Sequence, residues 1–97
     1  MGETIKATAN DKRQVLKVIE QCAEMELYLG AKILRTPIEE SAEDRRRETM
    51  YTERRLSNET LAKLMGISKE EIKEARNKGY DRANATVQEA DNDGWRD

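Results

Sequence analysis

The sequence predicts an all-α protein: a small helical domain with a long central N-terminal helix, and two short helices joined by a glycine turn toward its C-terminal end. Apolar residues recur at helical rather than alternating spacing. Charged residues make up 39% of the chain and apolar residues 36%, a balance that suits helices with wide solvated sides better than packed sheets. One proline and five glycines among 97 residues leave room for long helices, and this length supports one core.

The first long helix is expected over residues 12–35. Residues 1–10 show no periodicity and are expected to be disordered. Asp11 is a good N-cap, and a glutamine follows three residues later as in a capping box, so the helix is expected to start near Lys12. It must end before Pro37, because the residue before a proline is disfavoured in a helix. The helical domain as a whole is expected to cover residues 11–79.

The helix over residues 12–35 is apolar around most of its circumference. Its polar side chains fall on one stripe at about 100° per residue: Arg13, Lys17, Glu20, Gln21, Glu24 and Arg35. A surface helix would be polar over a wider sector, so this helix is expected to be either the centre of the domain or half of a dimer interface. Candidate interface residues of a homodimer recur seven apart or on the adjoining row: Val15, Ile19, Cys22, Leu29 and Ile33.

Charge is unevenly distributed, although the net charge is only −2. Residues 37–44 carry four acidic side chains, and residues 45–55 carry five arginines and two glutamates. The arginines stand just before the glycine turn, where they can contact phosphates whatever the overall charge. Glu26 lies toward the apolar side of the first helix and is expected to reach solvent at the helix edge. The alternative is a buried ion pair with one of the arginines.

A second helix is expected to start at Pro37. Thr36 can cap it, and Glu39 can close a capping box, while the missing N–H of a proline costs nothing at the first helical position. The helix is expected to run to about Arg55, and the sequence leaves open whether it breaks near Thr49.

Residues 57–79 predict two short helices and a tight turn. Asn58, or the serine before it, can cap the first helix. Gly66 suits the left-handed conformation that a sharp turn requires. Ser68 opens the second helix with a glutamate three residues on, as in a capping box. Gly79 is expected to end that helix, as glycine often does just after the C-cap.

This stretch resembles the helix-turn-helix of small phage and bacterial transcriptional regulators. The residues that carry the resemblance form its packing pattern: Leu61, Ala62, Met65, Gly66, Ile67, Ile72 and Ala75. The resemblance implies that the second short helix reads base edges in the major groove. The base-reading residues would be those exposed on this helix: Ser68, Lys69, Glu70, Lys73 and Asn77. Contacts to the DNA backbone would come from flanking polar residues: Arg54, Arg55, Asn58, Thr60, Lys63 and Lys78.

Residues 80–97 are expected to form a short helix capped by Asp81, or a flexible acidic tail. Trp95, the only tryptophan, either folds back onto an apolar patch or anchors another subunit or protein.

The composition disfavours catalysis. The chain has no histidine to act as a base near neutral pH, and Cys22, its only cysteine, has no neighbour to activate it and is expected to be a small core residue. No cofactor is expected. No metal site is expected either, because contiguous acidic residues on a helix are usually solvated. No segment is apolar over the length of a membrane span, and the N-terminus lacks the apolar core of a signal peptide, so a cytoplasmic location is expected.

Two hypotheses of function follow. The first is a transcriptional regulator that binds specific sequences of double-stranded DNA as a homodimer through its helix-turn-helix. Three glutamates of the second short helix would weaken this binding, because they repel phosphates: Glu70, Glu71 and Glu74. The second is a protein-binding regulator, such as an anti-repressor or an inhibitor of a host enzyme. Its protein partner would dock on the motif or on the long apolar helix.

Overall fold

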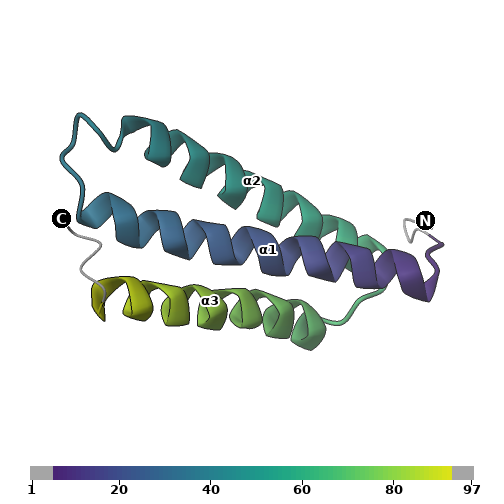
Figure 1. Ribbon diagram of the computed structural model, residues 1–97. Helices are drawn as coiled ribbons and strands as arrows, with labels where there is room; N and C mark the ends of the chain where they lie inside the picture. Colours follow the sequence, from purple (N-terminus) through teal and green to yellow (C-terminus); the bar gives the residue numbers. More distant parts are fainter. Residues whose placement is uncertain (1–5, 93–97) are drawn as a thin grey trace.

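The computed structural model describes residues 6–92, and it describes side chains as far as residue 89. This part of the chain forms three helices and no strand: α1 (Ala9–Leu34), α2 (Ala42–Leu64) and α3 (Lys69–Asn92). The three helices lie side by side with α1 in the middle (Figure 1), and the molecule measures 53 × 25 × 17 Å along its principal axes. The all-α class is therefore confirmed, and α1 is the central helix that its wide apolar surface predicts. α2 and α3 pack on opposite sides of α1 and contact each other at few points.

α1 begins three residues earlier than predicted. Thr8 is its N-cap: the Thr8 hydroxyl accepts a hydrogen bond from the N–H of Asp11 at 3.1 Å, and the N–H of Thr8 donates to the Asp11 carboxylate at 3.1 Å. Asp11 is thus the third residue of α1, which closes the capping box, and not the N-cap. Residues 9 and 10, predicted to be disordered, are helical, and residues 1–5 lie outside the described range.

The connection between α1 and α2 differs from the predicted helix start. The N–H groups of Glu40 and Ser41 both donate to the carbonyl of Pro37 at 3.0 Å, and they close a separate turn. α2 begins after this turn and not at Pro37. The hydroxyl of Thr36, the predicted cap, donates instead to the carbonyl of Lys32 in α1 at 2.8 Å. α1 does end before the proline, as predicted.

α2 continues without a break through the position where a new helix was predicted. The side-chain amide of Asn58 donates to the carbonyl of Arg54 at 2.8 Å, and the Thr60 hydroxyl donates to the carbonyl of Leu56 at 3.1 Å. These polar side chains are satisfied inside a helix, so they do not need to cap one. The segment 42–64 contains no glycine or proline that would end it.

α3 also extends beyond its predicted end, because it runs through Gly79 to Asn92. A Cβ atom at Gly79 would lie 2.9 Å from both the Cβ of Ala23 and the backbone nitrogen of Glu24, and closer still to the carbonyl oxygen of Glu20. Gly79 therefore permits a close approach of α3 to α1 and does not stop the helix. Residues 80–92, predicted as a separate helix or tail, continue α3, and Trp95 lies outside the described residues.

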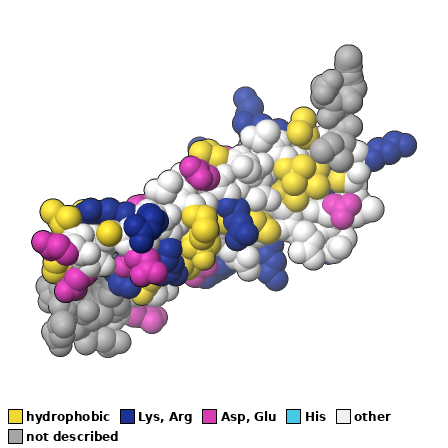
Figure 2. Space-filling model, turned by 90° about the horizontal axis from the view of Figure 1, so that it is seen from above, with side chains coloured by type: hydrophobic (Ala, Val, Ile, Leu, Met, Phe, Trp, Pro, Cys, Tyr) yellow, Lys and Arg dark blue, Asp and Glu magenta, His cyan; other side chains and the backbone are white. Residues whose placement is uncertain are grey.

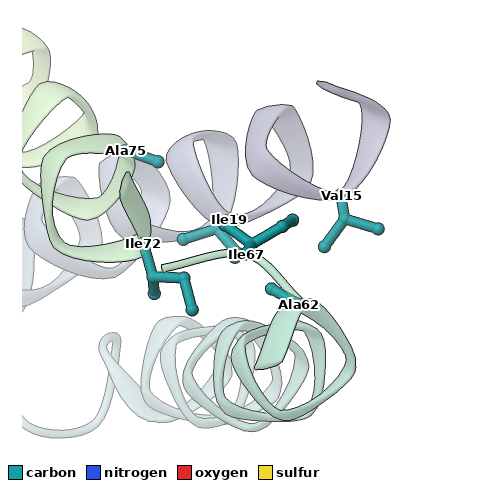
Figure 3. Close-up of a cluster of buried hydrophobic side chains, with 6 residues drawn as sticks. All are labelled: Val15, Ile19, Ala62, Ile67, Ile72 and Ala75. Atoms are coloured by element: carbon teal, nitrogen blue, oxygen red, sulfur yellow. The ribbon is translucent and has the colours of Figure 1, made fainter. Parts of the chain in front are cut away.

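A cluster of buried apolar side chains joins all three helices near the α2–α3 connection (Figure 3). Its buried members are Val15, Ile19, Ala62, Ile67, Ile72 and Ala75. Leu61 and Met65 pack against it. The packing pattern on which the resemblance rests therefore forms the core of the described structure, together with one face of α1.

Leucine in place of Ala62 is expected to lower the free energy of unfolding by about 1–3 kcal/mol. Ala62 is fully buried between Ile67 and α1, so three extra carbon atoms would force its neighbours out of their preferred rotamers. Urea denaturation measures the change. Leucine in place of Ala85, which is exposed on α3, is the matched control and should leave the midpoint nearly unchanged. Equal stability of the two variants would contradict the packing at Ala62.

Candidate nucleic-acid interface

The connection between α2 and α3 is a tight turn at Gly66. The φ angle of Gly66 is +85°, a value that residues with a side chain rarely adopt, and this bears out the predicted glycine turn. The N–H of Ile67 donates to the carbonyl of Ala62 at 3.0 Å, and the isoleucine side chain enters the core. The turn therefore fixes the start of α3 beside the end of α2.

Ser68 and Glu71 form the predicted capping box at the start of α3. The N–H of Glu71 donates to the Ser68 hydroxyl at 3.2 Å, and the N–H of Ser68 donates to the Glu71 carboxylate at 3.4 Å. The five predicted base-reading residues follow from this start and are all exposed: Ser68, Lys69, Glu70, Lys73 and Asn77.

The cations at the start of α3 share one face with a cation at the end of α2. Lys69, Lys73 and Arg76 recur at intervals of four and three residues, which places them on one side of α3. This side faces α2, because the Arg76 guanidinium pairs with Glu59 at 3.2 Å. Lys63, four residues after Glu59, is exposed on the same side of α2. We call Lys63, Lys69, Lys73 and Arg76 the basic face.

Of the three glutamates that weaken the DNA hypothesis, only Glu71 does not share a surface hollow with a lysine of the basic face. Glu71 and Glu74 border a cleft of about 340 Å³ between α1 and α3. Lys78, predicted to contact DNA phosphates, borders the same cleft. A shallow hollow on the outer side of α3 is lined by Glu70, Lys73, Glu74, Asn77, Lys78 and Asp81. Lys73 of the basic face therefore has Glu70 and Glu74 as near neighbours on α3, so the positive and negative charges of this helix are not fully separated.

The predicted phosphate contacts on α2 do not lie together. Lys63 is exposed beside the turn, and Asn58 and Thr60 donate to carbonyls of α2 itself. Arg54 borders a cleft between α1 and α2, on the side of α2 opposite Lys63. Arg55 is largely buried, so it cannot contact a DNA phosphate in this structure.

Arg55 is the centre of a buried network of charges that joins the three helices. Its guanidinium pairs with Glu26 of α1, and with Glu59 of α2 at 2.7 Å. Glu59 also forms an ion pair with Arg76 of α3. The side chains of Arg55, Glu26 and Glu59 are each only 11–12% exposed. Glu26 was expected to reach solvent, and this expectation is wrong; the alternative, a buried partner for an arginine, is what the structure contains.

Arg55 stays charged in this network. Burial by itself lowers the pKa of a guanidinium, but the hydrogen bonds to Glu26 and Glu59 outweigh it, and the pKa of Arg55 is raised. The two carboxylates therefore face a permanent positive charge. In the described part of the chain, no buried polar side-chain atom is left without a hydrogen bond.

The residues predicted to form a dimer interface belong instead to the interior of the chain. Val15, Ile19, Cys22 and Leu29 are all at most 7% exposed, and Ile33 is half-buried. They pack inside the chain because α2 and α3 cover α1 from both sides. Burial raises the pKa of the Cys22 thiol, and this effect outweighs the positive charge of Arg54, which lowers it. The thiol therefore stays protonated at neutral pH and behaves as the predicted core residue.

No family model, curated protein or solved structure matches this chain. Among residues 6–92, no three histidine, cysteine, aspartate or glutamate side chains lie close enough to hold a metal ion. None of the helices α1 to α3 combines the length and apolar content needed to cross a membrane.

Sequence reasoning missed two residues of this region. Arg76 was not among the predicted contacts, although its spacing from Lys69 and Lys73 was a usable signal. Glu59 gave no signal, because its role depends on two arginines, one of which comes from another helix.

Proposed function

We propose that the chain is a transcriptional regulator that binds double-stranded DNA through the start of α3 and the end of α2. The observation that carries the proposal is the basic face. Lys63, Lys69 and Lys73 are exposed around the Gly66 turn, on one side of the molecule, with Arg76 behind them. Phosphate contacts of this kind supply most of the affinity of a DNA-binding protein.

The exposed residues in the first half of α3 supply groups that can read bases. Asn77 can form two hydrogen bonds with adenine, Lys69 and Lys73 can donate to guanine, and Glu70 can accept from cytosine. All four are exposed and project from one rigid helix whose start is fixed by the capping box. A specific site would therefore be read by α3 and oriented by the lysines.

The fold differs in one respect from a pair of short helices packed across each other. α2 and α3 are long, and beyond the turn the ion pair between Arg76 and Glu59 is one of their few contacts. α1 fills the space between them. DNA would therefore meet the turn end of the molecule, where the helices converge. Homodimer formation stays a prediction, and its surface is not the buried face of α1.

Fluorescence anisotropy with random and genomic duplexes at about 50 and 200 mM salt tests the proposal, because phosphate contacts make affinity fall steeply between these conditions. Replacing Lys69 and Lys73 by glutamate should weaken binding on the order of a hundredfold at the lower salt concentration. Both side chains are exposed, so the helical circular dichroism should not change.

The matched control reverses two charges elsewhere, at Lys17 on α1 and Arg46 on α2, which are also exposed. It changes the net charge equally and should retain most of the affinity. Equal loss in both variants would show that binding follows net charge alone. The absence of salt-sensitive binding by the unmodified chain would overturn the proposal.

A protein-binding regulator is the second candidate, and the exposed apolar residues favour it. Leu34 is 86% exposed and Ile38 is 70% exposed at the α1–α2 connection, while Met50 and Leu56 of α2 are half-exposed. Viewed from the α2 side, hydrophobic side chains alternate with charged ones of both signs (Figure 2). This candidate would be supported if neither the unmodified chain nor the Lys69→Glu, Lys73→Glu variant bound DNA while both retained the same protein partner.

A further inference from the structure

α1 and α2 border an open cleft of about 540 Å³ on the side of the molecule away from the basic face. Val18, Cys22 and Met25 of α1 form its apolar wall. Its polar groups are an amide from each helix, a phenol and a guanidinium: Gln21, Tyr51, Arg54 and Asn58. The volume lies within the range of sites that hold small molecules.

Arg54, which is exposed at the edge of this cleft, differs from the arginines that form ion pairs across helices. Arg55, Arg76 and Arg82 each pair with glutamates of a neighbouring helix. No carboxylate in the described part of the chain forms an ion pair with Arg54, although its charge acts on the buried Cys22, which lines the cleft. The cleft thus holds a cation whose hydrogen-bonding groups are available to a ligand.

We propose that this cleft binds a small amphipathic carboxylate, with the carboxylate on Arg54 and the apolar body against Val18, Cys22 and Met25. A guanidinium matches a carboxylate with two parallel hydrogen bonds. The thioether of Met25 adapts to apolar groups of different shape. The phenol of Tyr51 and the amide of Gln21 lie within the same cleft to hydrogen-bond a polar substituent.

The site is independent of the proposed DNA contacts. Arg54 lies on the side of α2 opposite Lys63, and the cleft contains no residue of α3. Loss of DNA binding would therefore leave this proposal unaffected, and the reverse also holds.

Nuclear magnetic resonance titration of the full chain tests the site, with phenylacetate and hexanoate as probes. Saturable shifts are expected for the Met25 methyl group and the Tyr51 ring at probe concentrations up to about 10 mM, which corresponds to millimolar affinity. The uncharged analogues phenylacetamide and hexanamide should bind about tenfold more weakly, because they lack the charge-assisted hydrogen bonds.

Arg54→Gln should reduce the affinity for both carboxylates to that of the amides. Arg54 is exposed, so the thermal midpoint should not change. Arg46→Gln, which removes an exposed arginine two turns earlier on the outer side of α2, is the matched control and should bind the carboxylates as the unmodified chain does. The proposal is overturned by equal binding of carboxylates and amides, by an unchanged affinity in Arg54→Gln, or by the absence of saturable shifts at Met25 and Tyr51.

Discussion

Gly79→Ala is expected to lower the free energy of unfolding by about 2–3 kcal/mol, the upper part of the range for overpacked cores. In an exposed helix the same substitution would stabilise by about 1 kcal/mol, because alanine has the higher helix propensity. Here the new Cβ would lie 2.9 Å from the backbone nitrogen of Glu24, and the neighbouring atoms are largely backbone. These atoms cannot turn aside as the end of a flexible side chain can, so α3 must shift away from α1.

Gly30→Ala is the matched control for this prediction. A Cβ at Gly30 would meet, at 3.0 Å, a carboxylate oxygen of Glu48, which is the far end of a flexible side chain. The side chain can turn aside, so this variant is expected to be as stable as the parent or more stable by up to about 1 kcal/mol. Chemical denaturation of both variants measures the difference. Equal stabilisation by the two substitutions would contradict the close approach at Gly79.

Arg55→Ala is expected to destabilise the fold by about 3–5 kcal/mol, as removal of one partner from a buried ion pair usually does. It would leave Glu26 and Glu59 buried without the charge that both carboxylates share. Calorimetry or urea denaturation measures the loss. The same truncation at Arg82 removes exposed ion pairs with Glu20 and Glu24 and should have a small effect, because solvent screens them.

A third variant separates the charge from the packing. Replacing Glu26, Arg55 and Glu59 together by leucine, methionine and leucine removes the charges but keeps side chains of similar volume. Such replacements are often neutral or stabilising by about 1–4 kcal/mol. This variant should therefore be at least as stable as the parent. If this variant lost as much unfolding free energy as Arg55→Ala does, the ion pairs themselves would stabilise the fold, beyond neutralising one another's buried charge.

The apolar core was predictable because its signal is local and periodic. The spacing of Val15 and Ile19 in α1, and of Ala62, Ile67 and Ile72 around the glycine turn, indicates the buried faces directly. The turn was predictable for a similar reason: a glycine between two apolar segments indicates a positive φ. The width of the apolar surface of α1 indicated either a central helix or half of a dimer interface, and the structure places α1 in the centre.

Helix ends were less predictable, since the same residue can either end a helix or be accommodated inside one. Asn58 can cap a helix or bond a carbonyl within one, and only the continuous backbone of α2 decides between them. Gly79 can end a helix or permit close packing, and the deciding fact is the distance to Glu20 and Glu24 on another helix. Local sequence does not contain that distance.

Charged residues were the least predictable part of the candidate site. Arg54 and Arg55 are adjacent in sequence and were assigned the same role. In the structure one borders an open cleft, and the other is buried with two glutamates. A helix turns about 100° per residue, so neighbours face different surroundings, and the partner of Arg55 lies 29 residues away.

The position of α1 between the other two helices determines when the protein can complete its fold. α3 packs on α1, so its ion pairs join residues as far apart as Arg82 and Glu20, a separation of 62 positions. During synthesis, α1 and α2 emerge first, and one side of α1 stays uncovered until α3 has been made. Contacts over such separations slow folding, because a long loop must close first. The nascent chain therefore exposes an apolar face of α1 for the time needed to translate α3.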